Sequence, residues 1–331
     1  MRVLIVTNMY PTPEMPAFGS FVYDQVRALR AAGVAVDVFF INGRASTWNY
    51  LRAFPRYWRF LRGRKYDLIH AHYVLAGVVA RAQWGRKVVL THHGLEVLGY
   101  PHWQGWLCRL VTPLFDEVIY VTEELRRALR DGDGWVIPCG VEVERFIPLP
   151  KDEARARLGL APEKRLVLWA GEHWRSEKCF ELAERAVTRA RAELPDIELV
   201  LLTQRPHDEV PLYMSACDVL VLTSSVEGSP MVIKEAMACN LPIVSVPVGD
   251  VPEVIGGTPR CSLADRDPAD IAAKLIEAVR EPGRTDGRER IDHLRHDRIA
   301  RRIQTVYEHA LSPGDSATRG GWHGRERAAD V

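Results

Sequence analysis

Two carboxylates stand eight residues apart, on either side of a polar loop and the start of an apolar segment. Glu227 follows the β-branched run 219–222, and Glu235 lies within the segment that begins at Pro230. Proline is well tolerated in the first turn of a helix, so the sequence predicts that a helix begins there. Glu227 can then reach a ligand at the mouth of the helix, and Glu235 can accept two hydrogen bonds from a vicinal diol such as that of ribose.

The start of this helix offers a second kind of chemistry, because first-turn N–H groups have no partner within a helix and suit phosphate or sugar oxygens. The candidate binding residues of this element are Gly228, Ser229, Pro230, Met231 and Val232. A simpler interpretation is that Glu227 only interacts favourably with the positive end of the helix dipole, and that Glu235 is a solvated residue on the helix surface. The apolar neighbours Ile233 and Ala236 argue against it, because an unpaired buried carboxylate is costly.

The elements that must position these residues follow a regular pattern. Short β-branched runs alternate with helical patterns, which predicts an α/β fold of parallel sheets covered by helices. The expected strands are 3–7, 36–40, 68–71, 87–91, 117–121, 135–137, 166–170, 197–202, 219–222 and 243–246. We expect four parts, namely a first domain (1–148), a second domain (149–292), a helix that packs back on the first domain (293–311) and a disordered tail (312–331). The crevice between the domains is the expected site, because ligands bind at the carboxyl ends of such strands.

The composition of the 331-residue chain excludes several classes of protein. Its 44 basic and 43 acidic residues give a net charge of +1, so no overall charge favours a nucleic-acid partner. No apolar run is long enough for a membrane span, and the first residues run directly into a strand, so we expect a cytoplasmic protein. Six scattered cysteines without C-x-x-C spacing argue against a disulfide framework or a zinc cluster.

The residues around the two glutamates are similar to a known family. The pattern Glu227-Gly228-x-Pro230-x4-Glu235, followed by Ala-Met-Ala, resembles the E-x7-E motif of retaining glycosyltransferases of family 4, which have the GT-B fold. The resemblance extends from Met1 to about residue 311 and is nearest to members of capsule, lipopolysaccharide or teichuronic acid synthesis. It implies two Rossmann-like domains whose parallel sheets face a central cleft.

The resemblance also implies roles for five side chains. Glu227 would meet hydroxyls of the donor sugar, and Glu235 would bind the nucleotide ribose. Arg175 and Lys178 would hold the donor diphosphate, and His93 would lie beside the reacting sugar. Positive charge is needed there, because negative charge builds on the leaving diphosphate as the glycosidic bond breaks.

Two glycines match the family and three features depart from it. Gly19 belongs to the first loop, and Gly171 follows the strand that opens the second domain. Members commonly carry G-R-x4-K-G, whereas this chain has Glu172 after the glycine and Cys179 after the lysine. Only 203–210 stands where most members place a strand and a base-contacting loop, so we expect a shortened second sheet, and the resemblance does not fix the base.

The implied activity is retaining, metal-independent sugar transfer from a nucleotide diphosphate sugar to a saccharide or lipid-linked hydroxyl acceptor, without a further cofactor. The departing phosphate would take the proton of the acceptor. Two alternatives stay open, namely a sugar-nucleotide epimerase of the same fold and an inactive homologue that acts within a polysaccharide assembly complex. An oxidoreductase is a further alternative, but no G-x-G-x-x-G motif is present.

The segment from Arg44 to Lys65 is a candidate surface for anionic membrane. It holds seven basic residues, no acidic residue and six aromatic residues. An interfacial helix there would place the protein on the inner face of a membrane and would suit a lipid-linked acceptor. The alternative is an ordinary helix with its aromatic residues turned inward. We expect Pro55 to interrupt any single long helix.

Two further groups could bind a metal. Four histidines fall at the ends of consecutive strands, which makes zinc conceivable, although no carboxylate or cysteine completes a known ligand motif. They are His70, His72, His92 and His93. The two D-x-D triplets, Asp131–Asp133 and Asp265–Asp267, are better interpreted as a turn and a helix start in which Asp267 is the N-cap. We therefore expect no metal site.

Overall fold

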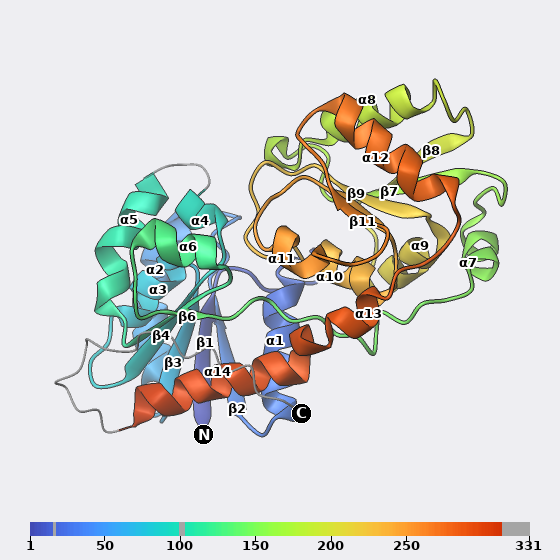
Figure 1. Ribbon diagram of the computed structural model, residues 1–331. Helices are drawn as coiled ribbons and strands as arrows, with labels where there is room; N and C mark the ends of the chain where they lie inside the picture. The colour runs from blue at the N-terminus through green and yellow to red at the C-terminus, as the bar shows by residue number, and fades with distance from the viewer. Residues whose placement is uncertain (16–17, 99–102, 313–331) are drawn as a thin grey trace.

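The computed structural model describes residues 1–15, 18–98 and 103–312, and these form two α/β domains side by side (Figure 1). The first domain contains a six-stranded parallel sheet of order β2-β1-β3-β4-β5-β6. Its strands are β1 (Arg2–Thr7), β2 (Ala35–Phe40), β3 (Leu68–His72), β4 (Lys87–His92), β5 (Glu117–Tyr120) and β6 (Trp135–Val136). Of the tail that we expected to be disordered (312–331), residues 313–331 lie outside the described residues.

Helices cover both faces of this sheet, as its buried, β-branched strands require. They are α1 (Ser20–Ala31), α2 (Trp48–Leu61), α3 (Val74–Arg81), α4 (Leu95–Leu98), α5 (Trp103–Val111) and α6 (Glu123–Leu129). The register pairs Thr7 with His72 and His72 with Thr91. The carboxyl ends of β1, β3 and β4 therefore meet at one edge and bring the histidines together there.

The second domain contains a five-stranded parallel sheet of order β11-β10-β9-β7-β8, one strand fewer than the first. Its strands are β7 (Arg165–Ala170), β8 (Ile197–Leu202), β9 (Val219–Leu222), β10 (Ile243–Ser245) and β11 (Cys261–Leu263). Its helices are α7 (Lys151–Leu158), α8 (Phe180–Ala190), α9 (Val210–Ala216), α10 (Met231–Ala238), α11 (Val251–Ile255), α12 (Pro268–Arg280) and α13 (Gly287–Arg290). Two 3₁₀ turns, η2 (Ser176–Lys178) and η3 (His207–Glu209), lie in its loops.

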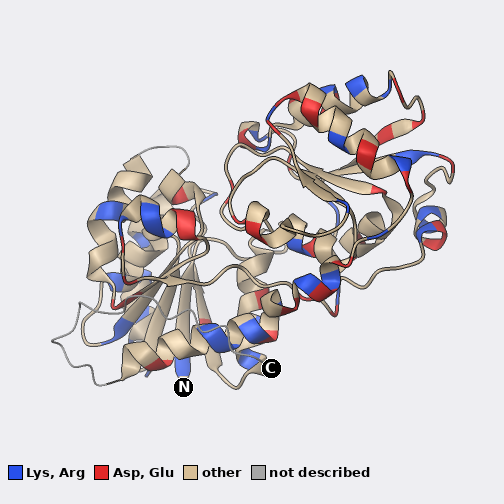
Figure 2. Ribbon diagram, viewed as in Figure 1, with Lys and Arg blue, Asp and Glu red and all other residues tan. Residues whose placement is uncertain are grey.

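The last helix, α14 (His296–Leu311), returns from the second domain to the first (Figure 1). It packs against α1 and β4, and the hydroxyl of its buried Tyr307 lies 2.7 Å from Nδ1 of His70. Figure 2 shows basic positions along this helix. Its apolar face completes the first core while its charged face points outward.

Helix α2 corrects one expectation, because it continues through Pro55 without interruption. Proline removes one backbone donor and crowds the preceding turn, which usually breaks or kinks a helix. Here Pro55 is exposed, so water can satisfy the carbonyl left free, while Ala53, Tyr57 and Leu61 anchor the opposite face in the core. No helix in the described part of the chain is long and apolar enough to cross a membrane.

Candidate active site

The loop between β9 and α10 presents a row of free backbone donors. Pro230 is the N-cap residue of α10, and the helix ends before Asn240, whose φ of 53° is left-handed. Four N–H groups of the loop and first turn donate no hydrogen bond to any described residue. They belong to Gly228, Ser229, Met231 and Val232. Such unpaired donors, at the positive end of a helix, form a site for an anion.

A lysine and a glutamate meet beside this loop. Nζ of Lys178 lies 2.6 Å from Oε1 of Glu227, and both side chains are largely buried. The lysine comes from η2, which is tied to the end of β9 because the hydroxyl of Thr223 donates to the carbonyl of Lys178 at 3.1 Å. The structure therefore brings together two of the side chains predicted for the site, although they stand 49 residues apart in the sequence.

Arg175 lies in the same loop but pairs with acids of its own segment. Its guanidinium contacts Glu177, with Nη2 2.5 Å from Oε1, and lies 3.6 Å from Oε2 of Glu172. It forms no ion pair with Glu227 among the described residues. A ligand phosphate would therefore compete with two carboxylates for Arg175, but with only one for Lys178.

The loop that carries these cations has an unusual backbone at its end. Cys179 has φ 48° and ψ 48°, a left-handed conformation that a glycine would adopt without cost. The backbone at this position therefore has the conformation that suits the glycine of other family members, although the residue here is a cysteine. At its other end, Gly171 is half-buried, and a Cβ there would lie 3.2 Å from the ring of Trp169.

Glu235 is buried with 7% of its surface exposed, as its apolar neighbours predicted. Its Oε1 lies 3.0 Å from Nε2 of His207, a partner that the sequence did not indicate. Burial lowers the pKa of His207, but the hydrogen bond and the charge of Glu235 outweigh this effect and raise it above the usual value. Glu235 is therefore a partnered carboxylate and not a solvated one.

The two domains touch through backbone at this point. A Cβ added to Gly228 would lie 1.9 Å from the carbonyl oxygen of His93, and one added to Gly94, whose φ is 122°, would lie 2.8 Å from the Cα of Gly228. Gly249 approaches the same loop, since its Cβ would lie 2.1 Å from the carbonyl oxygen of Gly228. Only glycine allows these approaches, so the site is built where both domains converge.

His93 is held in a cluster of rings at the end of β4. Its Nε2 lies 2.9 Å from Nδ1 of His72, and the ring of Tyr73 stacks on it with the centroids 4.7 Å apart. Burial lowers the pKa of His72 to about 3 and that of His93 well below its usual value, so both rings are neutral at pH 7. Tyr73 has a φ of 71°, a strained value for a tyrosine, which is typical of functional sites.

The other histidines have local partners. His70 hydrogen-bonds to Thr91, and His92 hydrogen-bonds to Thr112, at 2.7 Å and 2.9 Å. In the described ranges, no group of three or more histidine, cysteine or acidic residues is arranged to hold a metal ion. Asp267 is the N-cap of α12, as predicted, because its carboxylate accepts hydrogen bonds from two backbone N–H groups of the first turn.

Two families of known proteins match the chain in succession. Residues 3–145 match Glycosyltransferase Family 4, and residues 167–281 match the Glycosyl transferases group 1. The chain is a glycosyltransferase whose first domain matches family 4. It is 26% identical to a teichuronic acid biosynthesis glycosyltransferase of Bacillus subtilis over 77% of this chain and 83% of the relative. It is 28% identical to a D-inositol 3-phosphate glycosyltransferase of Thermobispora bispora over 77% of this chain and 68% of that protein.

Solved structures agree on the fold of this glycosyltransferase. A sucrose-phosphate synthase of Thermosynechococcus elongatus superposes with a TM-score of 0.78 at 21% identity, over 95% of this chain and 99% of the other. The Anabaena protein HepE, solved in complex with UDP and glucose, has a TM-score of 0.68 at 16% identity, over 93% and 99% of the two chains. The predicted GT-B arrangement of two Rossmann-like domains is confirmed.

A buried ion pair supports the loop between β9 and α10 from behind. Nζ of Lys234, whose side chain is fully buried, lies 2.8 Å from Oδ2 of Asp250. The same carboxylate oxygen accepts a hydrogen bond from Ser229 at 2.6 Å, and Ser229 in turn accepts one from the N–H of Cys139 at 3.2 Å. This network ties α10 to the chain that leaves the first domain. The sequence reasoning missed Lys234, although it lies between Ile233 and Glu235 in an apolar helix.

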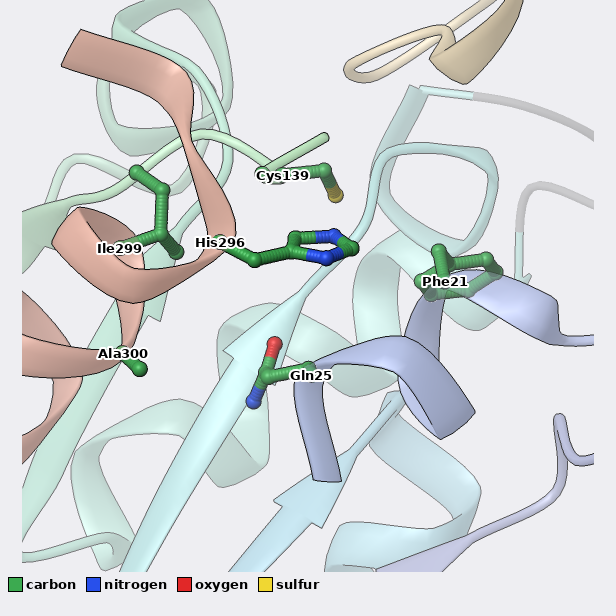
Figure 3. Close-up of a pocket in the computed structure, with 7 residues that line it drawn as sticks. Phe21, Gln25, Cys139, His296, Ile299 and Ala300 are labelled. Carbon is green, nitrogen blue, oxygen red and sulfur yellow. The ribbon is translucent and has the colours of Figure 1, made fainter. Parts of the chain in front are cut away.

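Gly19 shapes the start of α1, beside the histidine cluster of the first domain. It is the N-cap of α1 with a φ of 70°, and a Cβ there would lie 2.3 Å from the backbone of Met9. This tight approach places the ring of Phe21, in the first turn, 5.0 Å from that of His93. Beside it lies a small pocket into which the imidazole of His296 points, with Cys139 and Gln25 on either side of it (Figure 3).

Proposed function

We propose that this glycosyltransferase moves a sugar from a nucleoside diphosphate sugar to a hydroxyl acceptor with retention of configuration and without a metal ion. The observation that supports it is the pairing of Lys178 with Glu227 beside the free N–H groups of α10, with Glu235 farther along the same helix. An anion at these donors would lie against the lysine. A cation placed there stabilises the charge of the leaving diphosphate more than it stabilises the bound donor.

In the proposed reaction the acceptor hydroxyl attacks the anomeric carbon from the face on which the diphosphate leaves. The bond between that carbon and the phosphate oxygen breaks, its electron pair stays on the phosphate, and the same phosphate takes the proton of the acceptor. Glu227 accepts hydrogen bonds from sugar hydroxyls and Glu235 accepts them from the ribose. His93 acts by its position, and Arg175 acts by its position and its charge.

The acceptor is proposed from the relatives. The Bacillus subtilis relative is named for teichuronic acid biosynthesis, and the Anabaena neighbour was solved with UDP and glucose. We infer that the acceptor here is a saccharide or a lipid-linked saccharide in the synthesis of a cell-surface polysaccharide or glycolipid.

The test is transfer from a panel of nucleotide sugars to octyl glycosides in EDTA, followed by proton NMR of the product. We expect an α-linked product from an α-linked donor, at a rate that EDTA leaves unchanged. A β-linked product, or a rate abolished by EDTA, contradicts the proposal. Conversion of the donor to its epimer without acceptor identifies an epimerase, and bound nucleotide without turnover identifies an inactive homologue.

We also propose that α2 rests on the inner face of a membrane that contains anionic lipids. One stripe of the helix exposes large apolar side chains, with Trp48 67%, Leu51 59% and Trp58 56% exposed, and exposed arginines flank it. Trp58 donates its indole N–H to the carbonyl of Ala82 at 2.5 Å, near Trp84, which is 95% exposed. Exposed tryptophans beside arginines suit the boundary between anionic headgroups and acyl chains.

Vesicle sedimentation tests this surface. The wild-type protein should bind vesicles with 30% phosphatidylglycerol, and Arg59→Glu with Arg62→Glu should reduce binding at least about tenfold, since each basic residue near an anionic surface contributes about 1 kcal/mol. Arg185→Glu with Arg189→Glu, on exposed positions of α8, is the matched control. Equal loss in both double variants, or no loss in either, removes α2 as the membrane surface.

A further inference from the structure

Glu235 uses only one of its two carboxylate oxygens within the protein. Oε1 accepts the hydrogen bond of His207, whereas Oε2 accepts none from the described residues and is not among the polar atoms sealed from solvent. A carboxylate held at one oxygen has a fixed orientation and presents the other oxygen to a ligand. The partner that holds it therefore decides where the free oxygen lies.

His207 is itself oriented by an arginine. Nη1 of Arg145 lies 2.8 Å from Nδ1 of His207, and a guanidinium can only donate, so Nδ1 is the accepting nitrogen. The proton of the neutral ring then stands on Nε2, where it points at Glu235. The ring also packs edge-on against Phe146, with the centroids 5.5 Å apart. Both ring nitrogens and one ring edge are thus fixed.

Arg145 also contacts residues outside the second domain. Its Nη2 lies 2.8 Å from Oε2 of Glu142, in the segment between β6 and α7, and Nη1 lies 3.7 Å from Oδ2 of Asp24. Asp24 is a buried residue of α1, in the first domain. A continuous line of polar contacts therefore leads from α1 through Arg145 and His207 to Glu235.

We propose that His207, oriented by Arg145, is a positioning residue that fixes one oxygen of Glu235 so that the other meets the ribose diol. This inference rests on the proposed nucleotide site. In this proposal the segment 203–210, through His207, makes the site select ribonucleotides over 2′-deoxyribonucleotides. Without the hydrogen bond from His207, the carboxylate can rotate and loses part of its ability to distinguish a diol from a single hydroxyl.

The experiment compares the affinities of a ribonucleoside diphosphate and its 2′-deoxy form, measured by calorimetry. The ribonucleotide is whichever of UDP, GDP, ADP and CDP binds the wild-type protein most tightly. We expect the ratio of the two affinities to fall about tenfold in His207→Leu, which is the effect of losing one hydrogen bond to a charged group. His207→Gln places an amide N–H near the position of Nε2 and should restore most of the ratio.

Two controls separate this inference from the site on which it rests. His309→Leu removes another histidine paired with a glutamate, since Nδ1 of His309 lies 2.8 Å from Oε1 of Glu117, and should leave the ratio unchanged. If no diphosphate binds the wild-type protein, the proposed function fails. Suppose that Glu235→Ala brings the ratio of the two affinities to about one, while His207→Leu keeps the wild-type ratio. The donor site then stands, and the role proposed for His207 is wrong.

Discussion

Lys178 and Glu227 form an ion pair that an incoming diphosphate must loosen. Because the charge on the diphosphate is greatest as the glycosidic bond breaks, the lysine acts mainly on the transition state. We expect Lys178→Ala to lower kcat about 100-fold, a typical effect of one lost electrostatic contact, and to weaken nucleoside diphosphate binding less than about tenfold.

Glu235→Gln should give the opposite pattern, with weaker nucleotide binding and a smaller change in kcat. Steady-state kinetics together with calorimetry separate the two quantities. The assigned roles are contradicted by a Lys178→Ala variant that binds poorly but turns over normally, or by a Glu235→Gln variant that binds normally but does not turn over.

Buried neutral histidines make stability depend on pH. Burial lowers the pKa of His72 to about 3 and that of His296 to about 4, below the usual 6.5 of the unfolded chain. The unfolded state therefore binds more protons between about pH 4 and 6.5, and the free energy of unfolding falls as the pH drops through that window, by up to about 1.4 kcal/mol per pH unit for each histidine.

Urea unfolding at pH 7.5, 6.5 and 5.5 measures this slope, and His296→Gln should reduce it below pH 6.5. An unfolding free energy that is the same at pH 7.5 and 5.5 in the wild-type protein would show that these rings are protonated in the fold.

The sequence indicates a single residue's environment only where its neighbours in the chain create it. Glu235 was predicted to be buried because apolar residues flank it in one helix, and the structure confirms this burial. His207 lies in a polar segment, and its contacts come from residues 28 and 62 positions away, so no local pattern marks it. Tertiary packing alone brings it to the glutamate.

At the scale of one element, α10 depends on an ion pair at its buried face. Removing one partner of a buried pair leaves the other charge uncompensated and typically costs about 3–5 kcal/mol. We therefore expect Lys234→Met to lower the free energy of unfolding by about 3 kcal/mol, because Asp250 stays buried beside it.

In urea unfolding, the double variant Lys234→Met with Asp250→Asn should lose clearly less free energy of unfolding than the two single variants lose together. Lys274→Met, on α12, is the control, since Lys274 pairs with Glu277, which is largely exposed, and such pairs contribute little. Additive losses in the double variant would show that Lys234 and Asp250 do not act as a pair.

Elements with strong local patterns were predicted within one or two residues. The strands from β1 to β10 lie within two residues of the expected ranges, and most of them are buried apolar runs. The sequence missed β11, which has only three residues, lies at the edge of its sheet and is half-exposed. It also misjudged Pro55, because the packing of α2 on the first sheet outweighs the cost of one proline.

At the scale of the whole molecule, the contact between Gly228 and His93 sets how closely the domains approach. A Cβ at Gly228 cannot fit 1.9 Å from the carbonyl oxygen of His93. We expect Gly228→Ala to part the domains here, with faster hydrogen exchange in 91–96 and 224–230 and at least about tenfold lower turnover, since misplacement by about 1 Å can cost 100-fold.

The far-ultraviolet circular dichroism of Gly228→Ala should stay that of the wild-type protein, because each sheet keeps its own core. Gly132→Ala, at a glycine with open space around it, is the matched control. Unchanged exchange in Gly228→Ala would mean that the domains do not meet at this glycine in solution.

Thermal unfolding in EDTA with UDP, GDP, ADP, CDP and dTDP, each added in turn, tests most directly whether α10 carries a nucleotide site. A ligand at about 100 times its dissociation constant stabilises the fold by roughly 2.7 kcal/mol, which raises Tm by several degrees. The predicted result is a rise in Tm with one or more of these diphosphates in the wild-type protein, which Glu235→Gln reduces or abolishes. No rise with any of them, or an equal rise in both proteins, would contradict the site described for Glu235.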